Sequence, residues 1–149
     1  MKKALFLGII FLALLLESRI SVFGTPPNLT AAIAYYLGLK YGETKGIFFG
    51  SLIGLLEDGL SGNILGPNLL GKGLVGFFAS FMSGSFFRWT PLLGMFGIFF
   101  LTALDGITVF FSRTAFELMP TSIPNAISIV IVSAIMNSFL GIFIRPQND

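Results

Sequence analysis

Six apolar segments, separated by polar turns, run through almost the whole chain. Hydrophobic residues make up 54% of the sequence and charged residues only 11%, against roughly 25% charged residues in a soluble domain. A chain with so few polar side chains cannot cover itself with a water-exposed surface. The sequence therefore predicts one all-α membrane domain over residues 1–149, a helical bundle whose outer faces contact lipid.

Prolines, glycines and charged turns set the predicted boundaries. The apolar core of the second segment, 29–40, is only about 18 Å long, which is less than the ~30 Å hydrocarbon layer. This segment must extend through Pro26 and Pro27, be tilted, or lie in a region lined by protein. We expect six transmembrane helices, at about residues 3–23, 26–40, 45–60, 67–84, 91–111 and 124–144.

The N-terminal segment resembles a signal peptide, because two lysines precede an apolar run. The following ESRISVFGTPP lacks a small-x-small cleavage pattern, and the rest of the chain is also membranous. We therefore expect an uncleaved first helix, with Glu17 and Arg19 near its outer end, where they can reach the interface or pair.

The distribution of basic residues predicts the orientation. With a cytoplasmic N terminus, the outer loops hold only Arg19 and Arg113, while Lys72 lies within a segment. This asymmetry follows the positive-inside rule and predicts that both termini are cytoplasmic. It also puts Glu17, Glu57, Asp58 and Glu117 on the outer side. The predicted cytoplasmic basic residues are Lys2, Lys3, Lys40, Lys45, Arg88 and Arg145.

The residue types argue against catalysis. The chain contains no cysteine and no histidine, which excludes disulfides, thiol nucleophiles, histidine-dependent triads and Cys/His metal sites. No base or spaced acidic motif supports a Mg²⁺-dependent enzyme. The basic residues are scattered, so no nucleic-acid-binding patch is expected. We predict a non-enzymatic protein without cofactor or metal.

Four charged residues fall in the predicted outer half of the membrane layer. Glu57 and Asp58 end the third segment, Lys72 lies about one turn inside the fourth, and Asp105 lies within the fifth. Because an intramembrane charge costs about 2.5–3.5 kcal/mol on insertion scales, such residues are expected to be paired or functional. Lys72 is expected to pair with Asp58 or Asp105. The alternative is that the pair only locks the helices together and that Glu57 is a solvated helix end.

Small residues recur at every fourth position in the third and fourth segments. On a helix they stack into a groove that lets a neighbour approach closely. We expect close packing within this chain, with packing on a partner's membrane helix as the alternative. Asn137 in the sixth segment is expected to form an interhelical hydrogen bond rather than to bind a ligand. The small residues are Gly42, Gly46, Gly50 and Gly54, followed by Gly76, Ser80 and Gly84.

Residues 27–80 carry a pattern of their own. Pro27-Asn28-Leu29 opens the second segment, a short charged turn and a glycine-spaced helix follow, and an L-L-x-D-x-x-S-G-x-x-x-G-x-x-x-L corner ends it. This run resembles the rod shape-determining protein MreD family. Glu57 and Asn68-Leu69 depart from the family pattern, so the resemblance assigns no ligand role to Glu57. The corner here consists of Leu55, Leu56, Asp58, Ser61, Gly62, Gly66 and Leu70.

The resemblance implies a multi-pass protein of the bacterial inner membrane that acts without catalysis. Its implied partners are MreC, a bitopic membrane protein, the peptidoglycan polymerase and transpeptidase of the cell-elongation machinery, and indirectly the MreB filament. The implied fold is similar to the substrate-binding components of energy-coupling-factor vitamin transporters.

Two functions of different classes follow from this resemblance. In the first, the protein is a scaffold whose outer surface, near Asp58 and Gly62, holds the membrane helix or outer domain of MreC. In the second, it is a carrier whose outer cavity, lined by the four charged residues, binds a polar molecule such as a vitamin. A carrier needs convergent polar groups, and the outer segments are otherwise mostly Phe, Leu, Ile and Gly, which favours the scaffold. The candidate partner or ligand residues are Glu57, Asp58, Ser61, Gly62, Lys72 and Asp105.

Overall fold

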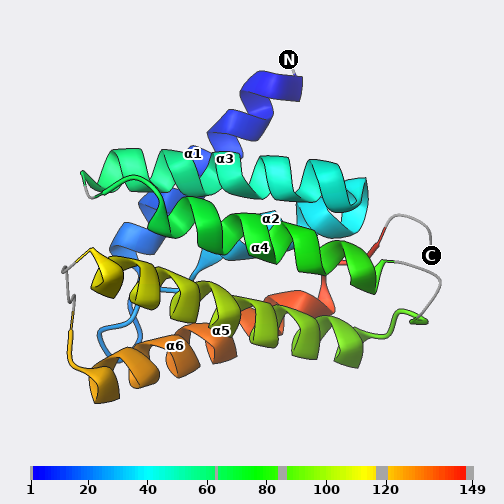
Figure 1. The fold of residues 1–149 in the computed structure, drawn as a ribbon. Helices are drawn as coiled ribbons and strands as arrows, with labels where there is room; N and C mark the ends of the chain where they lie inside the picture. The colour runs from blue at the N-terminus through cyan, green and yellow to red at the C-terminus, as the bar shows by residue number, and fades with distance from the viewer. Residues whose placement is uncertain (1, 63, 84–86, 117–120, 147–149) are drawn as a thin grey trace.

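The chain is all-helical over the part that the structure, a computed structural model, describes, which is residues 2–62, 64–83, 87–116 and 121–146. The helices form a bundle in which α3, α4, α5 and α6 lie in sequence order, with α2 behind α3 and α4 (Figure 1). The elements are α1 (Lys2–Arg19), α2 (Leu29–Tyr41), α3 (Glu43–Ser61), α4 (Pro67–Met82), α5 (Pro91–Ala115), α6 (Ile123–Ser138) and a 3₁₀ helix, η1 (Phe139–Ile142).

Successive helices run in opposite directions. The end of α3, the start of α4, the end of α5 and the start of α6 therefore lie at the left-hand end of the bundle in Figure 1. We call this the polar end, because the charged side chains described below gather there. The turn between α2 and α3 and the residues after η1 lie at the opposite end.

Local sequence explains where the helices begin. The side chain of Asn28 accepts a hydrogen bond from Ala31 N at 3.0 Å and caps α2. Thr90 caps α5 in the same way, and α4 and α5 each begin at a proline, whose missing N–H is not needed there. Extension of the second helix through Pro26 and Pro27 is therefore wrong, because α2 starts only at Leu29.

The other boundaries differ from the expected ones by a few residues. The first helix ends at Arg19 rather than near residue 23, and Gly24 continues the chain with a φ of 76°. The fifth helix runs on to Ala115, and the sixth tightens into η1 after Ser138. Within the described residues, two segments are long and apolar enough to cross a bilayer by length and composition, Pro91–Ala115 and Ile123–Ile142.

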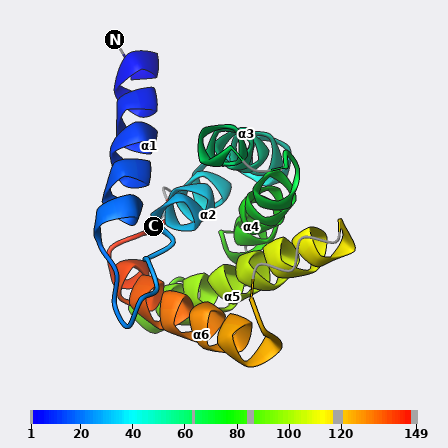
Figure 2. The same cartoon turned by 90° about the vertical axis from the view of Figure 1, so that its left-hand side faces the viewer.

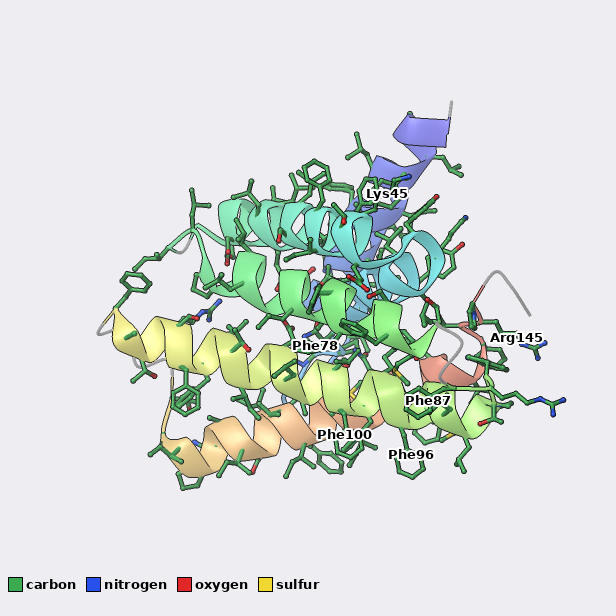
Figure 3. The ribbon with its side chains drawn as sticks, turned by 45° about the vertical axis from the view of Figure 1, so that its right-hand side comes forward. Lys45, Phe78, Phe87, Phe96, Phe100 and Arg145 are labelled. Atoms are coloured by element: carbon green, nitrogen blue, oxygen red, sulfur yellow. The ribbon has the colours of Figure 1, made fainter. Side chains whose placement is uncertain are left out.

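Helix α1 is only loosely attached to the bundle. It stands apart from the other helices, with α2 as its nearest neighbour (Figure 2). Among its described side chains only Ile10 and Ala13 are buried, whereas Leu5 is 69% exposed and Phe11 56% exposed. Apolar side chains also point outward from α5, where Phe96 and Phe100 extend away from the bundle (Figure 3). Such faces suit a lipid solvent.

Helices α3 and α4 pack against each other most extensively, and glycines allow it. A Cβ atom on Gly46, Gly50 or Gly54 would overlap the backbone carbonyl oxygen of Gly76, Lys72 or Asn68, respectively. The third-segment stripe therefore packs inside this chain through these three positions. Because glycine has no side chain, the backbones of α3 and α4 can lie in direct contact at these positions.

The remaining small residues lie elsewhere. Gly42 is not part of this contact, since nothing lies within 4 Å of a Cβ placed there. Its φ of 82° instead interrupts the helical conformation between α2 and α3. Ser80 is buried and donates a hydrogen bond to the carbonyl oxygen of Phe77 at 2.6 Å. Gly84 lies outside the described residues. The fourth-segment side of the contact is thus formed by Asn68, Lys72, Gly73 and Gly76.

Substitution of Gly50 tests this packing. Gly50→Ala places a methyl group against the Lys72 carbonyl, and we expect the free energy of unfolding to fall by about 1–3 kcal/mol, as for an overpacked core. Gly59→Ala in the same helix is the control. Nothing lies within 4 Å of its added Cβ, so it should be neutral or gain up to about 1 kcal/mol. Thermal unfolding of the purified protein in detergent separates the two; equal unfolding temperatures would contradict the close approach.

Candidate functional site

Lys72 is the centre of the polar end. Its side chain is 1% exposed, although it carries a charge in a chain dominated by apolar residues. Its Nζ lies 3.0 Å from Oε2 of Glu57, 3.1 Å from Oδ2 of Asp105 and 3.1 Å from Oδ1 of Asn68. All three N–H groups of the ammonium therefore have an acceptor. These contacts join α3, α4 and α5.

Asp105 extends this contact to α2. Its Oδ2 also accepts a hydrogen bond from Nδ2 of Asn28 at 2.6 Å. Its Oδ1 lies over Gly71, where a Cβ would overlap it, so only glycine leaves room for the carboxylate. Asp105 is 1% exposed and holds Lys72 and the start of α2 at the same time.

Asp58 has a different task from its neighbours. Its carboxylate is fully buried and accepts hydrogen bonds from the backbone N–H groups of Gly66, Asn68 and Leu69 at 2.9–3.2 Å, and from the Asn68 amide at 2.9 Å. It therefore caps α4 from the end of α3. The expected choice between Asp58 and Asp105 as the partner of Lys72 is resolved in favour of Asp105, with Glu57 added. An Asp58→Ala variant consequently reports on the fold of the corner rather than on partner binding.

Glu17 and Glu57 meet at the hydroxyl of Thr30. Thr30 Oγ1 lies 3.1 Å from Glu17 Oε1, 2.8 Å from Glu57 Oε2 and 3.2 Å from Asn28 Oδ1. A hydroxyl carries one hydrogen, so it can donate to only one of the three acceptors at a time. Thr30 N also donates to Glu17 Oε1 at 2.7 Å, which ties the end of α1 to the start of α2. The two glutamates thus keep acceptor capacity.

Asn137 completes the polar end from α6. Its Nδ2 donates to the carbonyl oxygen of Asn28 at 2.5 Å and to Oγ1 of Thr102 at 3.0 Å. The side chain is fully buried and joins α6 to α5 and to the residue that caps α2. Interhelical hydrogen bonding therefore accounts for this residue.

A pocket of about 330 Å³ opens beside these side chains. Its apolar wall is formed largely by α5 and α6, including Val109, Phe110, Ile129 and Val130. Of the four charged residues singled out from the sequence, only Glu57 lines it, because Asp58, Lys72 and Asp105 lie beneath its surface. The polar residues of the lining are Glu17, Asn28, Glu57, Asn68, Thr102, Arg113, Thr121 and Ser133.

This lining overturns the expectation that the outer segments offer few polar groups. Asn28, Asn68, Thr102 and Ser133 each stand alone in an apolar or turn sequence, so no spacing motif marks them. Asn28 and Asn68 lie near the predicted outer ends of their segments, whereas Thr102 and Ser133 lie near the middle of theirs and carry no such signal. The exposed corner residues Ser61 and Gly62 lie outside the pocket: Ser61 donates to the Asp58 carbonyl at 3.1 Å, and Gly62 ends α3 with a φ of 65°.

Removal of the Lys72 charge tests the ion cluster. Lys72→Met leaves Glu57 and Asp105 without their counter-charge, and breaking a buried pair in this way costs about 3–5 kcal/mol of stability. The double variant Lys72→Met/Asp105→Leu should recover part of this loss, since an apolar pair of similar volume is tolerated. Lys45→Met, an exposed lysine, is the control. Unfolding in detergent measures the stability of each variant. An equal loss of stability in Lys72→Met and Lys45→Met would contradict a stabilising role of the ion cluster.

Comparison with known proteins provides a family for this chain. A family model described as rod shape-determining protein MreD matches residues 2–145. No curated protein and no solved structure gives a significant match. The family match covers nearly the whole chain, so the resemblance drawn from residues 27–80 is confirmed and extends to both ends. The protein with this polar end and this loosely attached first helix belongs to the MreD family of membrane proteins involved in rod shape determination.

Proposed function

We propose that the protein crosses the bacterial inner membrane six times, with both termini in the cytoplasm, and acts there as a non-enzymatic scaffold. In this role it holds MreC, or a similar bitopic membrane protein, and through it helps to organise the cell-wall polymerase and transpeptidase, with the MreB filament contacted indirectly. Family membership supports the part in rod shape determination. The observation that carries the binding role is the pocket at the polar end.

The ends of the bundle support the orientation. Lys40 and Lys45 flank the turn between α2 and α3, and Arg145 follows η1 at the same end of the molecule. Among the described residues, Arg19 and Arg113 are the basic residues in the last turns of the helices that end at the polar end. Because basic residues favour the cytoplasmic side, the polar end is the outer end.

Short α2 is compatible with this arrangement. At 1.5 Å per residue its 13 residues cover about 20 Å, less than the ~30 Å hydrocarbon layer. Most of α2 is buried, including Tyr35 at 0% exposure, so other helices surround it except along the side that faces α1. A helix enclosed by protein does not have to match the thickness of the bilayer. This is the protein-lined alternative expected from the sequence.

The pocket combines features that suit a polypeptide segment. Oε1 of Glu17 and Oε2 of Glu57 already accept from Thr30 N and Lys72, so the other carboxylate oxygens of the two glutamates are the acceptors available to a partner, and Arg113 provides a cation. The α5 and α6 wall provides apolar contacts. A membrane-proximal segment of MreC with mixed polar and apolar side chains would find both kinds of contact there. Arginine is one of the residue types enriched in interface hot spots, and Arg113 supplies it here.

The alternative function, a carrier that binds a small polar molecule, is no longer disfavoured by the lining of the pocket, but no observation supports it. The polar lining removes the objection that the outer cavity would be empty of polar groups. The comparisons nevertheless provide no transporter relative, whereas the family match concerns cell shape. The scaffold is therefore the function we propose, and similarity to transporter components stays a prediction.

Cysteine accessibility tests the crossing pattern, and the chain is convenient for it because it contains no cysteine. The test uses cells from which the outer membrane and cell wall have been removed, with the inner membrane still closed. In these cells Ser61→Cys at the polar end should react with a membrane-impermeant thiol reagent added from outside. Lys45→Cys should react only after the membrane is opened. Both positions are exposed in the structure, so burial does not explain a difference. Labelling of both from the same side would rule out the proposed topology.

Filling the pocket tests partner binding. Ile129 lines the pocket and is 42% exposed, whereas Ile131, two residues further on α6, is 46% exposed and lies outside it. Ile129→Trp should reduce co-purification of MreC from native membranes at least about tenfold, the effect of losing roughly 1.4 kcal/mol of binding. Cells that depend on this variant should become round.

Ile131→Trp is the matched control and should retain both MreC and rod shape. Equal membrane levels of the two variants ensure that loss of protein does not explain the result. Normal recovery of MreC with Ile129→Trp would remove the pocket from the proposed interface.

A further inference from the structure

A second concave surface lies between α1 and α2, and its lining is more apolar than that of the pocket at the polar end. It is a groove of about 1010 Å³ between α1 and α2, with Phe49 and Leu52 of α3 and two residues near the C terminus completing it. Its α1 wall includes Leu5, Phe6, Ile9 and Leu12. The lining residues of the groove extend from Leu5 to Leu16 along α1, the helix that stands apart from the rest of the bundle in Figure 2. In a membrane such an apolar surface contacts either lipid chains or a partner's helix.

One end of the groove carries a positive charge. Lys40, at the end of α2, is the basic residue among those that line it. Its Nζ donates to the Tyr36 hydroxyl at 3.1 Å and lies 5.4 and 5.3 Å from the ring centres of Tyr36 and Tyr41. Among the described residues, no carboxylate forms an ion pair with it. Two tyrosines therefore position an ammonium whose charge is not neutralised.

Aromatic contacts show that this charge lies at the N-terminal end of α1. The ring of Phe49 contacts Tyr41 of α2 at a centroid distance of 5.8 Å and Phe6 of α1 at 6.1 Å. Tyr41 and the first turns of α1 are thus brought together on α3. In the proposed orientation this is the cytoplasmic end, where Tyr36 and Tyr41 would lie at the membrane interface.

We propose that the groove binds an anionic phospholipid, with its phosphate on Lys40 and the tyrosine hydroxyls and its acyl chains along α1 and α2. The charge decides between the two occupants. A partner helix that obeys the positive-inside rule carries lysine or arginine at its cytoplasmic end, which would face Lys40 and repel it. An anionic headgroup is attracted there. The choice of a lipid over a partner helix and the assignment of the headgroup to the cytoplasmic leaflet both rest on the proposed orientation, whereas the binding measurement in detergent does not.

Lipid retention by the full-length protein tests the proposal. The purified chain is incubated in detergent with equal amounts of phosphatidylglycerol and phosphatidylcholine that carry the same acyl chains, and the retained lipids are quantified. Wild type should retain phosphatidylglycerol about fivefold over phosphatidylcholine, the factor expected for one lysine at the headgroup. Lys40→Gln should reduce this ratio to about one. Lys45→Gln, which removes an exposed cation outside the groove, should leave the ratio unchanged.

A second pair of variants tests the acyl-chain part of the site. Ile9 lines the groove and is 48% exposed, so Ile9→Trp fills the groove without disturbing the core and should reduce the total retained lipid. Ile131→Trp, outside the groove, should leave the total retained lipid unchanged.

Equal retention of the two lipids by wild type, or an unchanged ratio in Lys40→Gln, would overturn the proposal. So would a photoreactive group at position 9 that captures a protein helix instead of lipid in cells. These readouts do not involve MreC. A negative result for lipid binding therefore leaves the scaffold role unaffected, and a negative result for MreC binding leaves the lipid site unaffected.

Discussion

The fold depends on one buried ammonium group, that of Lys72. An unpaired charge in an apolar interior is expensive, so the helices around Lys72 must bring acceptors to it. Glu57 comes from α3, Asn68 from the preceding turn of α4 and Asp105 from α5. Satisfying one cation thereby fixes the relative position of three helices. The glycine contact between α3 and α4 serves the same end, because it brings the Glu57 and Lys72 backbones close enough for the pair to form.

Polar contacts extend from this ion cluster to every other helix. Asn28 links Asp105 to the start of α2 and receives the Asn137 amide from α6. Thr30 links Glu57 to Glu17 at the end of α1. The side chains that remain exposed at the edge of this network line the pocket. In the proposed function, the same groups hold the bundle together and form the partner-binding surface, which would explain why no separate set of binding residues stands out in the sequence.

Local features of the fold could be predicted from the sequence, and long-range contacts could not. Prolines, glycines and charged turns placed the six helices to within a few residues, since these residue types act within one turn of a helix. The role of Asp58 as a cap for α4 depends on how close the start of α4 lies to the end of α3, which no spacing encodes. Lys72 and Asp105 were correctly brought together as a candidate pair, but the contribution of Glu57 was not recognised. A solvated helix end and an ion-paired one have the same local sequence.

The pocket at the polar end and the apolar groove both include side chains of α1. Glu17 near its end lines the polar pocket, and the side chains from Leu5 to Leu16 line the apolar groove. Helix α1 buries little of its surface against the bundle and is tied to it chiefly by Glu17, Ile10 and Ala13. A helix with so few internal contacts takes its position from what lies on either side of it. If both proposals hold, MreC at the polar end and lipid in the groove contact the same element, and the loose packing of α1 leaves the groove open to lipid.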